Sequence, residues 1–597
     1  MASSALGCTG PFCAQQIGLI RDPVVNILQS KLVGFSQNVD GRPLDFFLGV
    51  RYAKPPIGSL RFARPQKLDP WNGTVMAKQY GSSCLQNIPV GDYAEDCLFL
   101  NVIRPSGYTA SSKLPVLLFV HGYVLEKLQD RNFVFMSSVL TAQVSDSGSF
   151  QFGSGKDNNG SRIVAESMHA GSPVIWISIN YRLGAFGFLG GSSMLSAAKA
   201  GTAVLNAGMF DTRMALKWVQ RNIAAFGGDP TRVTLMGQSS GAFITGNMLL
   251  ARRGNNHNLF HAAIMQSGSP GSASTLPPDH PRLDQTFVDI SIALGCPPAP
   301  SDVSCLKSIS SSALAAAANN VTQFFWVQPQ TGLLPYMPVQ DFQVDGFFFP
   351  SAPHLLVSRG QFADVPVLSG CDYDEGTKGA PQNLNTSADF AQWLRAVAIP
   401  VANSTRVDRV VAQILKIFPD DVTFGAPYYR EPTRVSAGTT NITDPYYAPA
   451  TNQFKRAAAF YGAWRYEAPH RKFLLKKAAA GQRGIWSYRF AQQDLDGSAA
   501  EGVGHSSELA YIFGNTTEHS SVNLYSPLSK LMQRAWISFA THKDPRMLDN
   551  LHWPEFTGEH RAMIQFQGMA TRIVKEDFRE DQLAYIKSKE AAAVLSS

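Results

Sequence analysis

The sequence of 597 residues predicts an α/β protein with a mostly parallel central sheet and helices on both faces. Two runs, residues 114–120 (LPVLLFV) and 173–179 (PVIWISI), are apolar at nearly every position. Strands that are buried on both faces have this composition, whereas a strand with one wet face alternates apolar and polar residues. Between residues 211 and 265, segments with helical periodicity alternate with short apolar runs. Such alternation of strand and helix is typical of a parallel, wound sheet.

The N-terminal part of the chain predicts a lead-in followed by strands. Residues 1–22 are expected to be poorly ordered. Strand-like runs follow within residues 24–50. Pro55 and Pro56 then force a turn, because neither residue can donate a ladder hydrogen bond.

The rest of the chain continues the alternation in one domain, over residues 23–575. Short apolar runs predict strands at 232–236, 262–265, 364–368 and 484–490, and helical patterns predict helices over 211–226 and 242–252. The segment from about 270 to 480 is helical and rich in loops, and we interpret it as an elaborate helical cap on the same domain. A C-terminal tail is expected over residues 576–597.

A short motif between the strand at 232–236 and the next helix predicts a nucleophile. It reads Gly237-Gln238-Ser239-Ser240-Gly241. A serine on a sharp strand-to-helix turn is exposed at the end of the sheet, and the two glycines avoid collisions with neighbouring backbone. A chance match in a chain rich in Gly and Ser is the alternative. The strand before the motif and the helix after it favour Ser239 as the nucleophile.

A serine nucleophile needs a base that takes its proton and an acid that fixes the tautomer of the base. In enzymes with this arrangement, the acid and then the histidine follow the serine, each after a later strand. Three acids follow the strand at 364–368, namely Asp372, Asp374 and Glu375. His505 lies in the loop after the strand at 484–490. A packed core imidazole is the alternative interpretation of His505.

Composition and charge exclude several other classes of protein. The net charge of +7 is spread along the chain, and no basic run has interleaved aromatic residues, so nucleic-acid binding is not predicted. No stretch of about 18 apolar residues occurs, so no integral membrane segment is expected. No Cys/His spacing suggests a metal site, and the sequence predicts neither a metal nor a cofactor.

Cysteines and sequons favour secretion. Of seven cysteines, Cys84 with Cys97 and Cys296 with Cys305 lie close enough to form short disulfide loops, which persist in oxidising compartments. Reduced, buried cysteines are the alternative. No signal peptide is visible at the N-terminus, because a basic region and a continuous apolar stretch are missing. Seven sequons are candidate glycosylation sites: Asn72, Asn159, Asn320, Asn385, Asn403, Asn441 and Asn515.

Several longer segments follow one another in a characteristic order: Phe47-Leu-Gly-Val-Arg-Tyr-Ala-Lys-Pro-Pro56, Glu95-Asp-Cys-Leu-Phe-Leu-Asn101, Asn180-Tyr-Arg-Leu-Gly-Ala-Phe-Gly-Phe188, Phe226 to Gly241, Met265-Gln-Ser-Gly268, Asp374-Glu-Gly376, and His505 with Glu508-Leu-Ala-Tyr-Ile-Phe513. In this order, from about residue 24 to 570, they resemble the type-B carboxylesterase/lipase family. This family also contains cholinesterases and non-catalytic adhesion proteins, and the resemblance implies the α/β-hydrolase fold.

The resemblance implies roles for individual residues. Ser239 matches the nucleophile, Glu375 the acid and His505 the general base. Structural pairs are also implied: the ion pairs Arg61–Glu95 and Arg182–Asp211, and the disulfides Cys84–Cys97 and Cys296–Cys305. No partner is implied for Cys8, Cys13 or Cys371.

The loop after the strand at 114–120 departs from the family's pattern. Acyl transfer builds negative charge on the carbonyl oxygen, and backbone N–H groups must stabilise this charge. The family has His-Gly-Gly-x-Phe here, but this chain has His121-Gly122, then 25 residues, then Gly148-Ser149-Phe150. Removal of residues 123–147 restores the motif. The expected oxyanion-hole donors are Gly122, Gly148, Ser149 and Ser240.

We therefore interpret residues 123–147 as a non-native insertion, a translated and unspliced intron. Gly122-Tyr123-Val124 can be encoded with a splice donor, Leu140-Thr141 with a branch point and Asp146-Ser147 with an acceptor. A genuine surface insertion is the alternative, since loops tolerate added residues. If the chain is made as written, we expect a damaged oxyanion hole.

The sequence thus predicts a serine carboxylesterase that acts on a small-molecule ester through an acyl-enzyme. Only twelve residues separate Cys84 from Cys97, too few for a lid helix with hinges, so soluble or short-acyl esters are favoured. The same loop has no Trp to hold a quaternary ammonium, which disfavours a cholinesterase. The alternatives are a lipase or sterol esterase, a non-catalytic interaction protein on the same fold, or the inactive product of a mis-spliced gene. The oligomeric state is not predicted.

Overall fold

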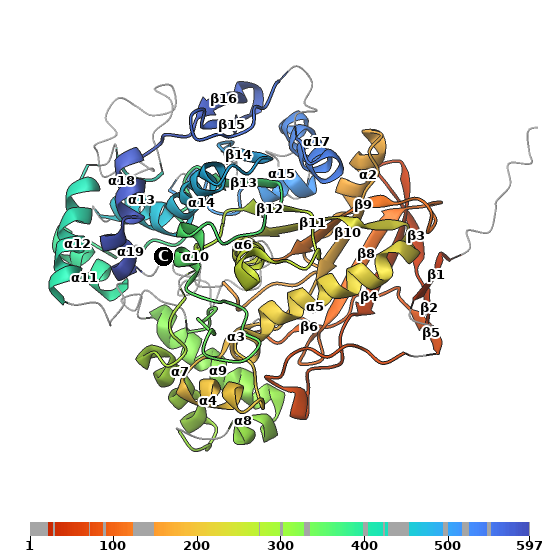
Figure 1. The fold of residues 1–597 in the computed structure, drawn as a ribbon, viewed down its shortest axis with the longest axis horizontal. Coiled ribbons are helices and arrows are strands. Elements are labelled where there is room, and N and C mark those ends of the chain that lie inside the picture. Colours follow the sequence, from red (N-terminus) through yellow and green to blue (C-terminus); the bar gives the residue numbers. More distant parts are fainter. Residues whose placement is uncertain are drawn as a thin grey trace, which may run out of the picture.

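The computed structural model describes most of the chain between residues 22 and 595 (Figure 1). The residues that it does not describe within these limits are 28–29, 71, 87–90, 123–148, 274, 299–302, 328–334, 382, 398–403, 422–423, 428–452, 494–499, 516–523 and 546–550. Several predictions therefore lie outside the described residues: the lead-in up to residue 21, the insertion at 123–147, Gly148, Cys8, Cys13, Asn403 and Asn441.

A sheet of eleven strands forms the centre of the described structure, in the order β16-β15-β14-β13-β12-β11-β9-β10-β8-β4-β3. Neighbouring strands from β15 to β10 are parallel, and antiparallel strands flank them at both ends. The prediction of a mostly parallel sheet is confirmed. The strands are β3 (Phe35–Val39), β4 (Arg42–Arg51), β8 (Phe99–Pro105), β9 (Leu114–Val120), β10 (Ile175–Ile179), β11 (Gly228–Gln238), β12 (Ala262–Gln266), β13 (Val367–Asp372), β14 (Ile485–Phe490), β15 (Ala562–Phe566) and β16 (Arg572–Lys575).

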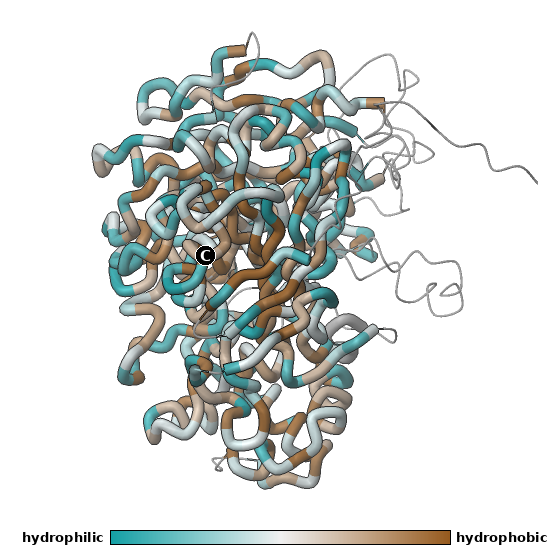
Figure 2. The backbone as a smooth tube through the Cα atoms, turned by 90° about the vertical axis from the view of Figure 1, so that its right-hand side faces the viewer, coloured by the Kyte–Doolittle hydropathy of each residue, from teal (hydrophilic) through white to brown (hydrophobic). Residues whose placement is uncertain are grey.

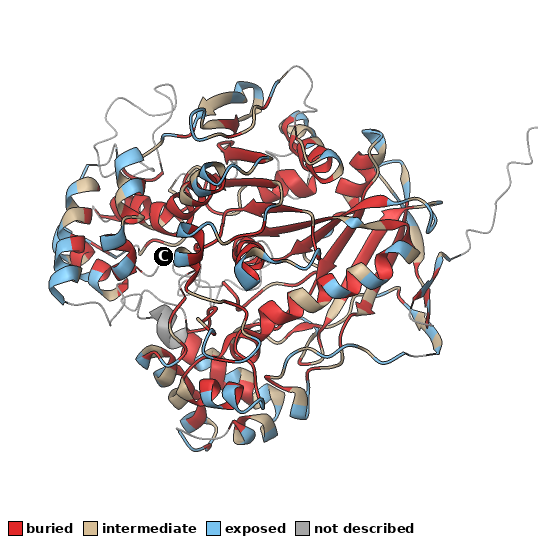
Figure 3. Ribbon diagram, in the orientation of Figure 1, coloured by how far each residue is buried: buried red, intermediate tan, exposed pale blue. Residues whose placement is uncertain are grey.

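Both faces of this sheet are covered, as the apolar runs predict. Alternate residues of β9 belong to two different apolar clusters: Val116 and Leu118 to one, Leu117 and Phe119 to the other. Figure 3 shows the central strands buried along their length, with exposed residues on the outer faces of the surrounding helices. The first cluster includes α5 (Ala207–Asn222) and α6 (Ser240–Leu250), and the second includes α2 (Ser161–His169), α15 (Leu509–Phe513) and α17 (Ser526–His542).

The predicted strands lie in this sheet, with one shift that matters for the site. The run at 114–120 coincides with β9, whereas the run at 364–368 becomes β13, which begins at Val367 and continues to Asp372. Pro366 has no N–H group for the ladder, so the strand starts after it. The extension brings Asp372 to the carboxyl end of the sheet.

The segment from 270 to 480 carries most of the helices outside the central layers. Figure 1 shows α7, α8 and α9 grouped with α4 at one end of the molecule, and α11 and α12 at another. The hydrophobic segments run through the middle of the molecule in Figure 2. α4 comprises Ser192–Lys199. The helices of the segment from 270 to 480 are α7 (Pro281–Ala293), α8 (Ser304–Ser308), α9 (Ser311–Val327), α10 (Pro353–Ser358), α11 (Ser387–Val397), α12 (Ser404–Ile417), α13 (Phe454–Gly462), the π-helix η7 (Ala463–Glu467) and α14 (Ala468–Ala479).

The stretch for which a C-terminal tail was expected, residues 576–597, contains two helices, α18 (Glu580–Ile586) and α19 (Lys589–Leu595). Leu583, Ile586 and Val594 are buried in a third apolar cluster, together with residues of α11, α12 and α13. Since these apolar side chains are covered by the cap helices, the folded part of the chain continues beyond Lys575. Among the described helices, none is long and apolar enough to cross a membrane.

Candidate active site

The candidate site lies where the carboxyl ends of four parallel strands meet. β11 leads into Ser239, β13 into the loop that holds Glu375, β14 into the loop that holds His505, and β9 into Gly122. Parallel strands present these ends at one edge of the sheet, which is where open α/β sheets bind their ligands. Residues far apart in the sequence are therefore brought together.

The turn around Ser239 has the backbone that the Gly-x-Ser-x-Gly motif predicts. Ser239 has φ 55° and ψ −126°, a conformation that costs a non-glycine residue on the order of 1–3 kcal/mol. A Cβ atom on Gly237 would overlap the carbonyl oxygen of Gly241, and a Cβ atom on Gly241 would overlap that of Val120. The Ser239 N–H donates to the carbonyl of Gln266 at 2.9 Å. Glycine on both sides therefore allows the sharp turn.

The structure brings Ser239, His505 and Glu375 into one chain of hydrogen bonds. His505 Nε2 lies 2.8 Å from Ser239 Oγ, and His505 Nδ1 lies 2.6 Å from Glu375 Oε2. The second carboxylate oxygen of Glu375 accepts the backbone N–H of Asp372 at 2.8 Å. All three side chains are buried. This arrangement holds an imidazole in the tautomer that can take a proton from the serine.

The other two acids at the carboxyl end of β13, Asp374 and Asp372, accept hydrogen bonds from the backbone of the loop that carries His505. Asp374 Oδ2 accepts the N–H of Val503 at 3.0 Å, and Asp372 Oδ2 accepts the N–H of Ser507 at 3.0 Å. Both contacts tie the loop after β13 to the loop that carries His505. Glu375 is therefore the acid that the structure places on the imidazole.

Two further contacts fix the position of His505. The Tyr466 ring lies against the imidazole, with centroids 4.7 Å apart and an angle of 33° between the planes. Tyr466 belongs to the π-helix η7, and such helical bulges occur often at functional sites. Lys378 Nζ donates to the backbone carbonyl of His505 at 2.9 Å. Tyr466 could not be predicted from the sequence, because nothing in the local pattern indicates a π-helix.

Of the expected oxyanion-hole residues, three are described. A Cβ atom on Gly122 would lie 2.8 Å from the Cβ of Ser239, so Gly122 contacts the nucleophile directly. Ser240 is the first residue of α6, where backbone N–H groups have no partner within the helix. Ser149 is buried. Gly148 lies outside the described residues.

The described chain on either side of the predicted insertion comes together at Gly122 and Gly153. A Cβ atom on Gly153 would overlap the carbonyl oxygen of Gly122 and come within 2.5 Å of His121 Nδ1. The chain that leaves at Gly122 therefore returns beside the same residue. Phe150, just after the insertion, packs against Phe243 of α6 with ring centroids 6.3 Å apart.

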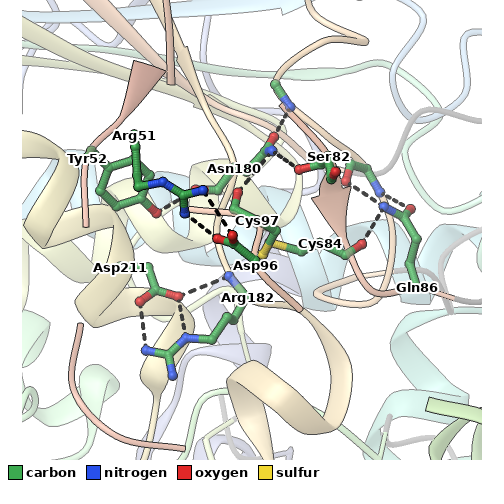
Figure 4. Close-up of a disulfide and its surroundings, with 12 residues drawn as sticks. Arg51, Tyr52, Ser82, Cys84, Gln86, Asp96, Cys97, Asn180, Arg182 and Asp211 are labelled. Carbon is green, nitrogen blue, oxygen red and sulfur yellow. Dashed lines mark hydrogen bonds and ion pairs between the residues drawn. A yellow bond between two sulfur atoms is a disulfide. The ribbon is translucent and has the colours of Figure 1, made fainter. Parts of the chain in front are cut away.

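The loop closed by the Cys84–Cys97 disulfide is tied to the oxyanion loop (Figure 4). Gln86 Nε2 donates to the carbonyl of Gly153 at 3.0 Å, and the Gly153 N–H donates back to Gln86 Oε1 at 2.8 Å. Asn180 also connects the disulfide loop to the segment that contains Gly153. Its Nδ2 donates to Cys97 O at 3.2 Å, and its Oδ1 accepts the Gly155 N–H at 2.8 Å. The disulfide loop is thus fastened at its active-site side.

The other pairs implied by the resemblance are also present as contacts. Arg61 binds Glu95 through two hydrogen bonds of 2.6 and 2.7 Å. Arg182 binds Asp211 through bonds of 2.8 and 2.7 Å, also drawn in Figure 4. Cys296 and Cys305 form the second disulfide, and Cys371 is free and buried. Burial raises the pKa of the Cys371 thiol well above its usual value, which disfavours the reactive thiolate.

Two buried carboxyl groups, Asp372 and Glu508, lie beside the Glu375–His505 contact. Glu508 Oε1 accepts Gln266 Nε2 at 3.0 Å, and the side chains of Asp372 and Glu508 lie within hydrogen-bond range of each other. Burial raises the pKa of both carboxyls. The sequence does not indicate this role for either residue, because their pairing depends on the fold.

The predicted glycosylation sites differ in exposure. Asn72, Asn159, Asn320 and Asn385 are exposed, and Asn515 is half-buried. Glycosylation of these residues stays a prediction. Within the described residues, no group of three or more His, Cys, Asp or Glu side chains is arranged to hold a metal ion.

Comparison with known proteins agrees with the fold. The carboxylesterase family model matches residues 21–143 and 146–586. Lipase 1 of Geotrichum candidum is 31% identical over 596 residues, covering 91% of this chain and 92% of that lipase. Secreted lipase 1 of Botryotinia fuckeliana is 29% identical over 579 residues, covering 92% of this chain and 90% of that lipase. The crystal structure of Aspergillus niger EstA has a TM-score of 0.75 and 25% identity, covering 95% of this chain and 98% of that chain.

The fold and the comparisons define an α/β-hydrolase, and the chain belongs to the carboxylesterase family. It is a carboxylic ester hydrolase. The predicted resemblance and fold are confirmed, and the alternative of a non-catalytic interaction protein is set aside.

Proposed function

We propose that this hydrolase is a serine carboxylesterase with Ser239 as nucleophile, His505 as general base and Glu375 as the acid that orients the base. The hydrogen-bond chain from Ser239 through His505 to Glu375 supports this proposal more than any other observation. A serine hydroxyl becomes nucleophilic when a positioned imidazole accepts its proton.

The contacts support a reaction in two halves. Ser239 Oγ attacks the ester carbonyl while its proton passes to His505 Nε2, and the imidazolium is stabilised by Glu375. The same nitrogen then returns the proton to the leaving alcohol, which leaves an acyl group on Ser239. In the second half, water attacks this acyl group while its proton passes to His505 Nε2. The bond from the acyl carbon to Ser239 Oγ then breaks, and His505 returns the proton to Oγ, which releases the acid and free Ser239.

Stabilisation of the oxyanion is assigned to the backbone N–H groups of Gly122, Gly148, Ser149 and Ser240. The position of Gly122 against Ser239 and of Ser240 at the start of α6 supports two of these donors. The N-terminus of α6 adds a favourable electrostatic field for negative charge. Each such donor typically contributes about a hundredfold to a thousandfold in turnover.

Soluble or short-acyl esters are the proposed substrates, and the disulfide loop supports this preference. A lid that opens at an oil–water interface must detach from the protein, but Gln86 binds the backbone of Gly153 through two hydrogen bonds. With twelve residues between the cysteines, the loop has little length for hinges. We therefore expect activity that does not jump when the substrate passes its solubility limit.

A lipase is the second candidate, and one observation favours it. Lipase 1 of Geotrichum candidum and Secreted lipase 1 of Botryotinia fuckeliana match almost the whole chain. Preference for long acyl chains and activation at an interface would favour this candidate.

The chain is also proposed to be secreted. The name of Secreted lipase 1 of Botryotinia fuckeliana and the two disulfides support this proposal.

Residues 123–147 are proposed to be a retained intron, an insertion at the oxyanion loop. The support is the restored His-Gly-Gly-Ser-Phe motif and the return of the chain at Gly153 to the side of Gly122. The chain as written should then be slower than the shortened chain by roughly a hundredfold to a thousandfold, the effect of one lost oxyanion donor.

Hydrolysis of 4-nitrophenyl esters from acetate to palmitate tests these proposals. Three proteins are compared: the chain as written, the chain without residues 123–147, and the shortened chain with Ser239→Ala. We expect the shortened chain to prefer short esters and Ser239→Ala to abolish hydrolysis. Equal activity of the first two proteins would contradict the damaged oxyanion hole, and mature transcripts that all retain codons 123–147 would contradict the intron. A steep rise toward palmitate with interfacial activation would favour the lipase.

A further inference from the structure

Beside the contact between Glu375 and His505 lie two buried carboxyl groups that the proposed mechanism does not use. We propose that Asp372 and Glu508 share a single proton and act as a pair of positioning residues, which clamps the loop of His505 onto the loop of Glu375. This inference rests on the proposed serine mechanism, because the pair acts on catalysis only through His505.

The hydrogen-bond donors around Glu375 identify it as the ionised carboxyl of the group. One oxygen faces His505 Nδ1 at 2.6 Å, and the other accepts the backbone N–H of Asp372 at 2.8 Å. Both oxygens are thus engaged as acceptors. A carboxylate that accepts from two N–H groups favours its charged form.

The donors around the pair locate the shared proton. Trp536 Nε1 donates to Gln266 Oε1 at 3.1 Å, which turns the Gln266 amide so that its nitrogen donates to Glu508 Oε1 at 3.0 Å. The backbone N–H of Ser507 donates to Asp372 Oδ2 at 3.0 Å. One oxygen of each carboxyl is therefore an acceptor and carries no proton.

The two remaining oxygens, Asp372 Oδ1 and Glu508 Oε2, are buried, and among the described residues no N–H or O–H group donates to them. The side chains of Asp372 and Glu508 are in hydrogen-bond contact with each other. Two acceptors can be joined only by a proton, and two carboxylates in contact would repel strongly in a site shielded from water. One proton between Oδ1 and Oε2 satisfies both oxygens and leaves the pair with one negative charge.

The surroundings favour retention of this proton at neutral pH. Asp372 is 1% exposed and Glu508 is fully buried, and burial is the main cause that raises the pKa of each. The charge of Glu375 raises the pKa of both carboxyls further. Lys378 lowers the pKa of Asp372, and the contact with Asp372, followed by His505, lowers the pKa of Glu508. The titratable and charged groups that face the pair are Glu375, His505, Lys378, Tyr488 and Cys371.

The position of the pair explains what it would do. Asp372 ends β13 three residues before Glu375, and Glu508 follows His505 by three residues at the start of α15. The shared proton therefore links the two loops whose side chains must meet in the Glu375–His505 contact. Loss of the proton at alkaline pH would place two repelling charges across this junction and move His505 away from Glu375.

Infrared spectroscopy and pH–rate profiles of the full chain test the proposal. Asp372→Asn keeps the geometry without a titrating proton, because its amide nitrogen can donate to Glu508 Oε2 and its oxygen can accept from Ser507. Asp372→Ala breaks the link. Asp374→Asn is the matched control for the infrared spectrum, since Asp374 lies on the same loop outside the pair.

We expect the carbonyl band of a protonated carboxyl in the wild-type spectrum at neutral pH. The band should fade on titration to alkaline pH and be missing in Asp372→Asn, but not in Asp374→Asn. The kcat/KM of Asp372→Asn at neutral pH should stay near the wild-type value. The pH at which kcat/KM falls on the alkaline side should be higher for Asp372→Asn than for the wild type. Asp372→Ala should lose roughly a hundredfold, the scale of a misplaced catalytic group.

An Asp372→Asn spectrum identical to wild type would overturn the shared proton, and an unchanged alkaline decline would overturn the positioning role. Ser239→Ala separates this inference from the proposed mechanism. If Ser239→Ala retains hydrolysis, the serine mechanism fails, and the infrared band still reports on the pair. If Ser239→Ala is inactive and the band is missing from the wild type, only the inference fails.

Discussion

At the residue scale, the site depends on a few positions where only one side chain satisfies the local chemistry. Gly237 and Gly241 have no room for a Cβ atom, and this lets Ser239 occupy its strained turn. The Gly-x-Ser-x-Gly pattern reveals these positions because the constraint is local in sequence. Asp372 and Glu508 meet only through tertiary structure, so no local pattern reveals their contact.

A buried histidine outside the active site predicts how the protein responds to acid. His470 Nδ1 lies 3.0 Å from Ser369 Oγ and Nε2 lies 3.1 Å from Ser487 Oγ, so the neutral imidazole joins β13 to β14. Burial, together with Arg489 and Arg471, lowers the pKa of His470 to about 3. The unfolded chain takes up this proton below about pH 6.5, whereas the folded protein does not.

Stability should therefore fall as the pH drops from about 6.5 toward 3, with a slope of up to about 1.4 kcal/mol per pH unit from this residue. Scanning calorimetry from pH 7 to 4 checks the expectation. His470→Gln should lose Tm less steeply with acid than the wild type, and the exposed His560→Gln should follow the wild type. Parallel curves for wild type and His470→Gln would contradict this role.

At the element scale, the strand ends position the reacting groups, and the two disulfide loops differ in whether they contact the site. β9, β11, β13 and β14 bring the reacting groups to one edge of the sheet. The Cys84–Cys97 loop then supports the oxyanion segment through Gln86, while Cys296–Cys305 closes a loop between α7 and α8 in the cap.

The two disulfides should consequently differ in their effect on catalysis. A disulfide that closes a loop of this size stabilises a protein by roughly 3 kcal/mol, so Cys84→Ser/Cys97→Ser and Cys296→Ser/Cys305→Ser should both lower Tm. Only the first double variant should also lose kcat, by about tenfold or more, because the oxyanion loop is then less well held. Thermal melts and steady-state kinetics on short esters measure both effects, and equal losses of kcat would refute the link through Gln86.

At the scale of the whole molecule, the sequence predicted the central layers better than the cap. The run at 114–120 coincides with β9, because a strand buried on both faces is apolar throughout. The start of β13 was displaced by Pro366, and α18 and α19 were missed because their few apolar residues are buried only by helices distant in sequence. Tyr466 was missed for a similar reason, since a π-helix has no local signature.

The central claim is that Ser239 becomes acylated. The direct measurement is mass spectrometry of the protein after treatment with a fluorophosphonate that mimics the tetrahedral intermediate, followed by peptide mapping. We predict one adduct per chain, on the peptide that contains Ser239, and no adduct in Ser239→Ala. Continued hydrolysis by a protein without an adduct on Ser239, or labelling at another residue with loss of activity, would contradict the account.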